Sequence, residues 1–163
     1  AVKLAYDHYG AVTDNTGEKI WERGNLVTRN QIMAIKSASS DASRSSLAVC
    51  LDTMLQKAGI TRNTQILLDE GQSVNEILTE GLEGCKILDL TGVAMDAVLY
   101  YVNQDIPVLA ILEGGEAVLI TGFNEYNVVI MNPSTGELGK KGMKDSANWF
   151  EENGNCFITY MYE

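Results

Sequence analysis

Histidine and cysteine, the side chains most used in nucleophilic catalysis and in zinc sites, are scarce in this 163-residue sequence. There is one histidine, His8, so a site with several histidine ligands is excluded, and any Cys–His or Ser–His pair must use His8. The cysteines Cys50, Cys85 and Cys156 show no C-x-x-C spacing, which argues against a zinc site. We therefore expect no metal and no cofactor. An odd number of thiols leaves at least one unpaired, and pairing of Cys85 with Cys156 stays open.

Cys50 is the alternative nucleophile that the sequence offers. It recurs with Leu47, Leu51 and Met54 at helical spacing, so we expect a buried structural thiol. His8 lies between an aspartate and a tyrosine and is expected to be exposed, away from any cysteine.

The composition is typical of one globular domain. There are 12 Lys and Arg against 22 Asp and Glu, a net charge of −10 without a basic cluster, which argues against a nucleic-acid partner. The longest apolar run, 106–112, is too short for a membrane span. The chain begins at Ala1 and shows no leader, and we interpret it as a processed or excised domain.

Apolar periodicity predicts helices first and strands later. A polar stretch over 37–46 is expected to form a surface loop that supplies the N-cap of the next helix. We expect helices over 47–55 (ended by Gly59), after Ser73 with a capping box to Glu76, from Thr91 to 101, and over 146–152. We expect a hairpin-like arm over 2–22 with a turn at 14–17, a short apolar segment over 30–35, and strands over 87–90, 108–112, 117–123, 128–131 and 156–161.

Helices followed by an antiparallel sheet indicate the α+β class. We predict a single domain over 1–163, with an N-terminal hairpin arm over 1–36, a helical part over 44–104 and an antiparallel sheet part over 106–163.

Three segments together resemble the bacterial C39-like peptidases, which have the papain-like cysteine-proteinase fold. The segment 46–59 (SLAVCLDTMLQKAG) is similar to the helix that begins at the catalytic cysteine in that family. The segment 114–123 (GGEAVLITGF) resembles the strand that carries the catalytic histidine after a glycine. The segment 128–134 (VVIMNPS) resembles the next strand, which ends in Asp-Pro or Asn-Pro. The resemblance spans about 46–160 and implies a helical part packed on an antiparallel sheet.

The resemblance also implies where catalytic residues would stand. Such an enzyme needs a thiolate at a helix N-terminus, an imidazole base and a group that orients the imidazole. These positions fall on Ser46, Glu116 and Asn132, while Cys50 matches a second, non-catalytic cysteine of the family. The oxyanion-hole glutamine would fall near Ser40, where the sequence has none. The resemblance therefore implies a catalytically degenerate member in which only Asn132 fits.

The same positions have interpretations without catalysis. A carboxylate is a weaker base than an imidazole, so a Ser46–Glu116 pair would be feeble. The Asn-Pro dipeptide at 132–133 is frequent in turns, and Glu116 after two glycines suits a solvated strand start as well as a ligand contact. We expect Trp149 and Phe150 in the core.

Three functions are weighed. The first is a non-catalytic domain whose groove, between the Ser46 helix and the Glu116 strand, binds a peptide or protein; the charge of Glu116 would suit a cationic peptide. The alternative is an active cysteine peptidase or amidase using Cys50. The second alternative is a purely structural domain of a cell-surface protein. The likeness to bacterial proteins favours an extracellular or cell-surface location, and the oligomeric state is not indicated.

Overall fold

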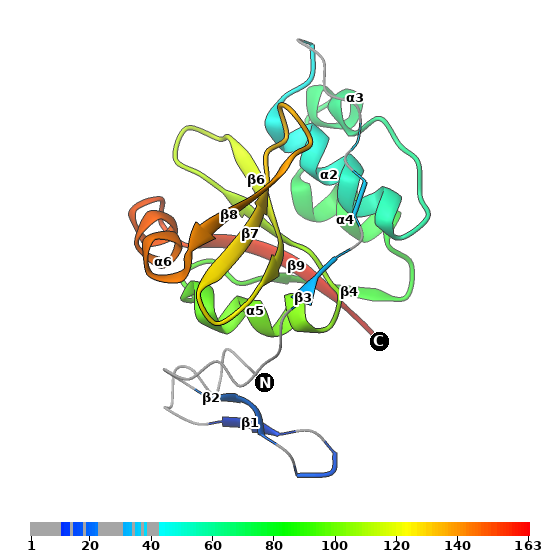
Figure 1. The fold of residues 1–163 in the computed structure, drawn as a ribbon. Helices are drawn as coiled ribbons and strands as arrows, with labels where there is room; N and C mark the ends of the chain where they lie inside the picture. The colour runs from blue at the N-terminus through cyan, green and yellow to red at the C-terminus, as the bar shows by residue number, and fades with distance from the viewer. Residues whose placement is uncertain are drawn as a thin grey trace.

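An antiparallel sheet forms the centre of the molecule (Figure 1). The computed structural model describes residues 11–13, 15–17, 19–22, 31–33, 35–36, 38 and 43–163. The main strand order is β4, β9, β5, β6, β7, β8, and every pair is antiparallel. The strands are β4 (Cys85–Asp89), β5 (Val108–Ile111), β6 (Ala117–Phe123), β7 (Asn127–Met131), β8 (Leu138–Gly142) and β9 (Cys156–Tyr162).

Three short strands come from the N-terminal part of the chain. β1 (Ala11–Thr13) and β2 (Lys19–Glu22) pair with each other as a separate two-stranded sheet. β3 (Gln31–Ile32) instead pairs with the end of β6 in the main sheet.

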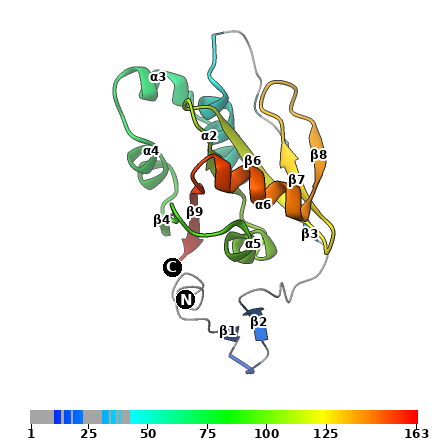
Figure 2. The same ribbon diagram turned by 90° about the vertical axis from the view of Figure 1, so that its left-hand side faces the viewer.

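The helices form two groups, both packed against the sheet (Figures 1 and 2). The first group contains α2 (Ser46–Lys57), α3 (Thr64–Asp69) and α4 (Val74–Gly81), and α2 contacts β5 and β6. The second contains α5 (Met95–Asn103) and α6 (Met143–Glu152), which contact each other. α6 also contacts β7 and β8, so it covers the part of the sheet next to the edge formed by β8.

The helix ends follow from local sequence, as expected. The side chain of Ser45 accepts a hydrogen bond from the backbone N–H of Ala48 at 3.1 Å and caps α2. Ser73 and Glu76 form the predicted capping box of α4. Gly59 has a φ of +84° just after α2, a conformation in which glycine carries no steric penalty.

One apolar core joins both helix groups to the sheet. The largest fully buried side chains are Leu51, Met54, Leu55, Ile77, Leu78, Met95, Leu99, Phe123, Phe150, Phe157 and Tyr160. Burying a side chain of this size stabilises the fold by about 1.5–3 kcal/mol. The predicted α+β class is confirmed.

Within the predicted hairpin arm, Ala11–Thr13 pairs with β2 across the predicted turn, and the segment before it lies outside the described residues. The predicted division of the chain into parts differs from the structure. β3 and β4 both join the main sheet although they fall in the predicted arm (1–36) and helical part (44–104). The predicted parts therefore do not separate helices from sheet.

α5 begins at Met95 and not at Thr91 as predicted. The carboxylate of Asp89 accepts hydrogen bonds from the backbone N–H and the hydroxyl of Thr91, at 3.0 and 2.6 Å. Gly92 then takes a φ of +88°, so these residues form a turn that delays the helix. α6 similarly begins three residues before the predicted helix, at Met143.

β8 was not predicted at all. Its sequence, LGKKG, has two glycines and no alternation of apolar residues. It becomes a strand because it pairs along its whole length with β7.

Candidate functional site

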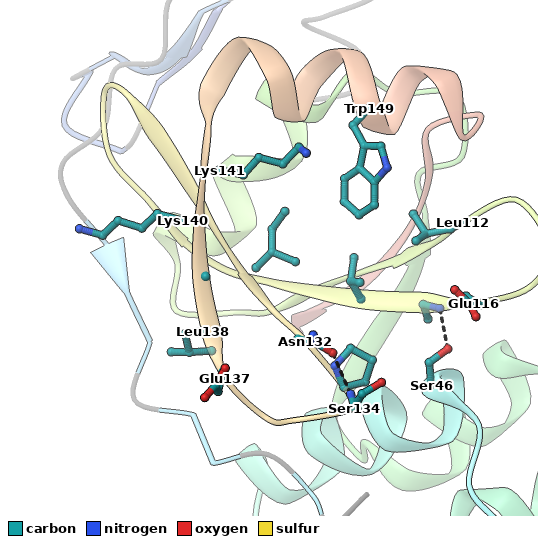
Figure 3. Close-up of a pocket in the computed structure, with 15 residues that line it drawn as sticks. Ser46, Leu112, Glu116, Asn132, Ser134, Glu137, Leu138, Lys140, Lys141 and Trp149 are labelled. Atoms are coloured by element: carbon teal, nitrogen blue, oxygen red, sulfur yellow. Dashed lines mark hydrogen bonds between the residues drawn. The ribbon is translucent and has the colours of Figure 1, made fainter. Parts of the chain in front are cut away.

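A groove of about 630 Å³ lies between the N-terminus of α2, the sheet and α6 (Figure 3). Ser46 is the first residue of α2, Glu116 directly precedes β6, and Asn132 directly follows β7. α2 contacts β6, and β6 and β7 are neighbours, so all three residues line the same groove. The structure thus brings Ser46, Glu116 and Asn132 to one groove.

Ser46 is held by the strand opposite it. Its Oγ accepts a hydrogen bond from the backbone N–H of Ala117 at 3.0 Å (Figure 3). Ala117 is almost fully buried, so this bond satisfies a backbone donor that water does not reach. The hydroxyl ties the start of α2 to the start of β6.

The side-chain oxygen of Asn132 is hydrogen-bonded within a local turn. Its Oδ1 accepts from the backbone N–H of Ser134 at 2.9 Å, and its backbone carbonyl accepts from Gly136 at 2.7 Å. This is the turn geometry in which asparagine is favoured. The turn interpretation of the Asn-Pro dipeptide agrees with these bonds.

Glu116 is exposed at the α2 end of the groove. Within the described part of the chain, no hydrogen bond joins its carboxylate to Ser46 or Asn132. Nucleophilic catalysis requires a base within hydrogen-bond reach of the nucleophile and a third group that orients the base. The three side chains share a groove without forming that chain of bonds.

Cys50 lies one turn further along α2 and faces the core. Its side chain is fully buried, and burial raises the pKa of its thiol to about 12. A reactive cysteine needs the opposite, a lowered pKa and access to substrate. The structure therefore gives Cys50 the environment of a structural thiol and places it outside the groove lining. His8, the one histidine that a cysteine nucleophile could use as its base, lies outside the described residues, as does the oxyanion position Ser40.

Cys85 and Cys156 are both free. Cys85 pairs with Tyr162 at one end of β9, whereas Cys156 begins that strand at the other end. Six residues of strand span about 20 Å, far beyond the reach of a disulfide. The register of β4 and β9 therefore excludes the disulfide between Cys85 and Cys156 that the sequence left open.

The other side of the groove is formed by residues for which the sequence predicted no role in a site. β8 contributes Gly139, Lys140 and Lys141, and α6 contributes Trp149. The Nζ of Lys141 lies 4.9 Å from the centre of the Trp149 ring, within cation–π range (Figure 3). The sequence feature that could have pointed to this side of the groove is the pair of adjacent lysines between the turn after β7 and the helix α6.

Trp149 departs in part from the prediction, because it is half-buried: it packs against the edge of the core and also lines the groove. Phe150 is in the core as expected, with its ring 5.4 Å from that of Phe157. The two adjacent residues of α6 lie on different faces of the helix. Half-buried apolar side chains of Leu112, Val118 and Ile130 complete the groove wall.

The described residues contain no cluster of three or more His, Cys, Asp or Glu side chains that could hold a metal ion. No helix among them is both long enough and apolar enough to span a bilayer.

The fold is shared with solved peptidase structures. No family model matches this sequence, and no curated protein matches it. A structure described as a C39-like peptidase from Bacillus anthracis superposes with a TM-score of 0.60 and 17% identity, over 83% of this chain and 98% of the other. This chain has the C39-like peptidase fold. A double-glycine-motif protease from an AMS/PCAT transporter, solved in complex with the leader peptide, has a TM-score of 0.53 and 14% identity, over 82% of this chain and 99% of the other.

The expected papain-like arrangement of helices and antiparallel sheet is therefore confirmed. At these identities the likeness concerns the C39-like fold alone. What the groove does must be argued from its own residues.

Proposed function

We propose that this chain is a non-catalytic, peptidase-like domain whose groove binds a polypeptide segment. The observation that carries the proposal is the hydrogen bonding of Ser46. The hydroxyl at the nucleophile position accepts the Ala117 N–H, and a carboxylate with no hydrogen bond to it stands where the resembled enzymes carry histidine. Without an adjacent base the serine hydroxyl stays protonated and is a weak nucleophile.

The groove has properties that suit a peptide. Its wall offers apolar side chains from the sheet and the indole of Trp149, and its rim offers charged groups of both signs. Apolar walls with a few polar groups are typical of ligand sites. The transporter protease with the same fold was solved with a leader peptide, which supports a polypeptide as the kind of ligand.

The absence of catalysis is tested by cleavage. A proteome-derived peptide mixture is incubated with the protein and with Ser46→Ala, and new peptide termini are counted by mass spectrometry. We expect neither sample to gain termini relative to the peptide mixture alone. New termini produced by the unchanged protein would contradict the proposal, and their loss in Ser46→Ala would assign the cleavage to Ser46.

Binding is tested by filling the groove from Gly139. A Cβ at Gly139 would meet only the carbonyl oxygen of Ile130, at 3.9 Å, and its φ is not in the left-handed region, so larger residues fit the backbone. We expect Gly139→Ala, Gly139→Val and Gly139→Leu to weaken binding on a random-peptide array progressively, by about tenfold or more for the largest. Replacing Gly139 can itself change the stability of β8, because residues such as valine favour strands. Thermal unfolding of each variant is therefore measured as the control.

The charge of Glu116 is tested separately. If the carboxylate receives an amine or a basic side chain of the ligand, Glu116→Gln should weaken basic peptides by about threefold to tenfold and leave neutral ones unchanged. Unchanged affinity for every basic peptide would remove Glu116 from the binding site but leave the groove.

A further inference from the structure

β8 is a free edge of the sheet and forms one wall of the groove. It pairs with β7 on one side, and no other described strand pairs with it. Its first three residues are exposed, including the apolar side chain of Leu138, which is 41% exposed. An exposed edge strand offers unpaired backbone groups to a further strand.

The hydrogen-bond phase of the ladder indicates which backbone groups are free. Just beyond β8, Met143 N–H donates to the carbonyl of Tyr126 at 2.7 Å. Bonded and non-bonded pairs alternate in an antiparallel ladder, so residues at even spacing from 143 direct their backbone groups at β7. Leu138 and Lys140 therefore turn their N–H and C=O groups away from β7, toward the free edge.

The same strand carries a local positive charge on an acidic chain. Lys140 and Lys141 are two of 12 basic residues in a sequence of net charge −10. Among the described residues, no carboxylate forms an ion pair with either lysine. Figure 3 shows Lys141 directed toward Trp149 and Lys140 directed away on the opposite side of β8. Consecutive lysines thus lie on opposite faces of one exposed edge.

We propose that an extended peptide segment with two consecutive acidic residues adds to the free edge of β8 as a further strand. In a paired strand consecutive side chains also point to opposite faces, so one acidic residue meets Lys140 and the next meets Lys141. Two positions along, the segment places an apolar residue beside Leu138. This rests on the proposed function, since β8 is a wall of the groove.

A second copy of this chain matches the same edge less well than an acidic segment does. In registers that set the lysines of two β8 strands opposite each other, the like charges are destabilising. The register centred on Gly139 sets Lys141 opposite Glu137 but leaves Lys140 opposite Leu138, whereas an acidic segment gives both lysines an opposite charge.

The test uses three capped, fluorescent octapeptides whose pattern is the same in both chain directions. The first is Thr-Val-Thr-Glu-Glu-Thr-Val-Thr, and the others replace the central pair with Gln-Gln or Lys-Lys. Fluorescence anisotropy should show the acidic peptide binding about tenfold or more tightly than the Lys-Lys peptide at low salt, with the difference shrinking as salt screens the charges. Equal or tighter binding of the Lys-Lys peptide would overturn the proposal, as would binding of all three weaker than about 1 mM.

Two kinds of change locate the contact. The double variant Lys140→Gln, Lys141→Gln should lose most of the preference for the acidic peptide, while Lys86→Gln, on the opposite edge strand β4, should keep it. Single N-methyl groups moved along the peptide should weaken binding at every second position, because only alternate residues bond to an edge. A uniform or absent effect would rule out strand addition.

The outcomes separate this proposal from the function on which it rests. If peptides bind and Gly139→Val weakens them, but the lysine variants and N-methyl groups have no effect, the groove binds peptides in another way. If no peptide binds on the random array, both proposals fail. A dimer detected by sedimentation whose stability changes in the lysine variants would assign the edge to a second copy and overturn the acidic segment.

Discussion

Ser46 and Ala117 are 71 residues apart in the sequence, yet their hydrogen bond fixes the distance between α2 and β6. Replacing Ser46 by alanine leaves the buried N–H of Ala117 without an acceptor. We expect Ser46→Ala to lower the free energy of unfolding by about 1–2 kcal/mol, measured by urea denaturation. Ser46→Thr keeps the hydroxyl and should lose less. A stability equal to that of the unchanged protein would show that the bond contributes nothing.

The thiols give a second prediction at the scale of residues. Cys50 is fully buried with a raised thiol pKa, whereas Cys85 and Cys156 are partly exposed. Iodoacetamide should therefore label Cys85 and Cys156 in the folded protein and label Cys50 only in denaturant, as followed by peptide mass spectrometry. Rapid labelling of Cys50 below pH 7 would instead identify it as a reactive nucleophile.

The resemblance of three segments to C39-like peptidases was enough to predict that Ser46, Glu116 and Asn132 would line one groove. It could not predict what they bond to. The partner of Ser46 is a backbone donor that only the tertiary fold brings near, and Trp149 faces the groove through the rotation of α6, for which its own sequence position gives no sign.

At the scale of elements, a buried carboxylate fixes the start of α2 against α3. Asp52 is almost fully buried, accepts the backbone N–H of Thr64 at 2.9 Å and forms an ion pair with Arg44. The hydroxyl of Thr64 in turn donates to the carbonyl of Ala48 in α2 at 3.0 Å. These bonds hold the helix end that presents Ser46 to the groove.

Removing that carboxylate should be costly, because it leaves buried donors and a partly buried guanidinium without a partner. We expect Asp52→Ala to destabilise the protein by about 3 kcal/mol, measured by chemical denaturation. The control is Asp69→Ala at the exposed end of α3, where the carboxylate accepts from Gln65 and a change within about 0.5 kcal/mol is expected. Equal effects of the two substitutions would contradict this role for Asp52.

Elements with strong local signals were predicted well, namely α2, α4 and the hairpin strands β6 and β7. β8 was missed because its residues disfavour a strand and only pairing with β7 overrides that preference. The start of α5 was misplaced because the side chain of Asp89 holds Thr91 in a turn, a competition that periodicity does not register.

At the scale of the whole molecule, the burial of thiol and phenol groups in their protonated forms predicts how the free energy of unfolding depends on pH. The pKa of Cys50 is raised from 9.0 to about 12, and burial also raises the pKa values of Tyr160 and Tyr101 above 10.0. Their contribution is fully present below the unfolded pKa values. As the pH rises above about 9, the unfolded chain loses these protons first, so the folded state loses stability.

The urea concentration at the unfolding midpoint should accordingly stay constant near pH 8, begin to fall at about pH 9, and continue to fall toward about pH 11. Cys50→Ala removes one of the groups and should make the first part of the decline shallower. A midpoint that rises with pH over this range would show that the groups are not buried in their neutral forms.

The central claim, a C39-like fold whose groove binds a peptide without cutting it, is tested most directly by one NMR titration. The ¹⁵N-labelled protein receives the Glu-Glu octapeptide, and both the protein amides and the peptide are followed in the same sample. The account predicts shifts at the amides of Leu138 and Lys140, whose N–H groups face the free edge, and at the Trp149 indole, with the peptide intact throughout. Cleavage of the peptide, or shifts that leave the groove unchanged, would contradict it.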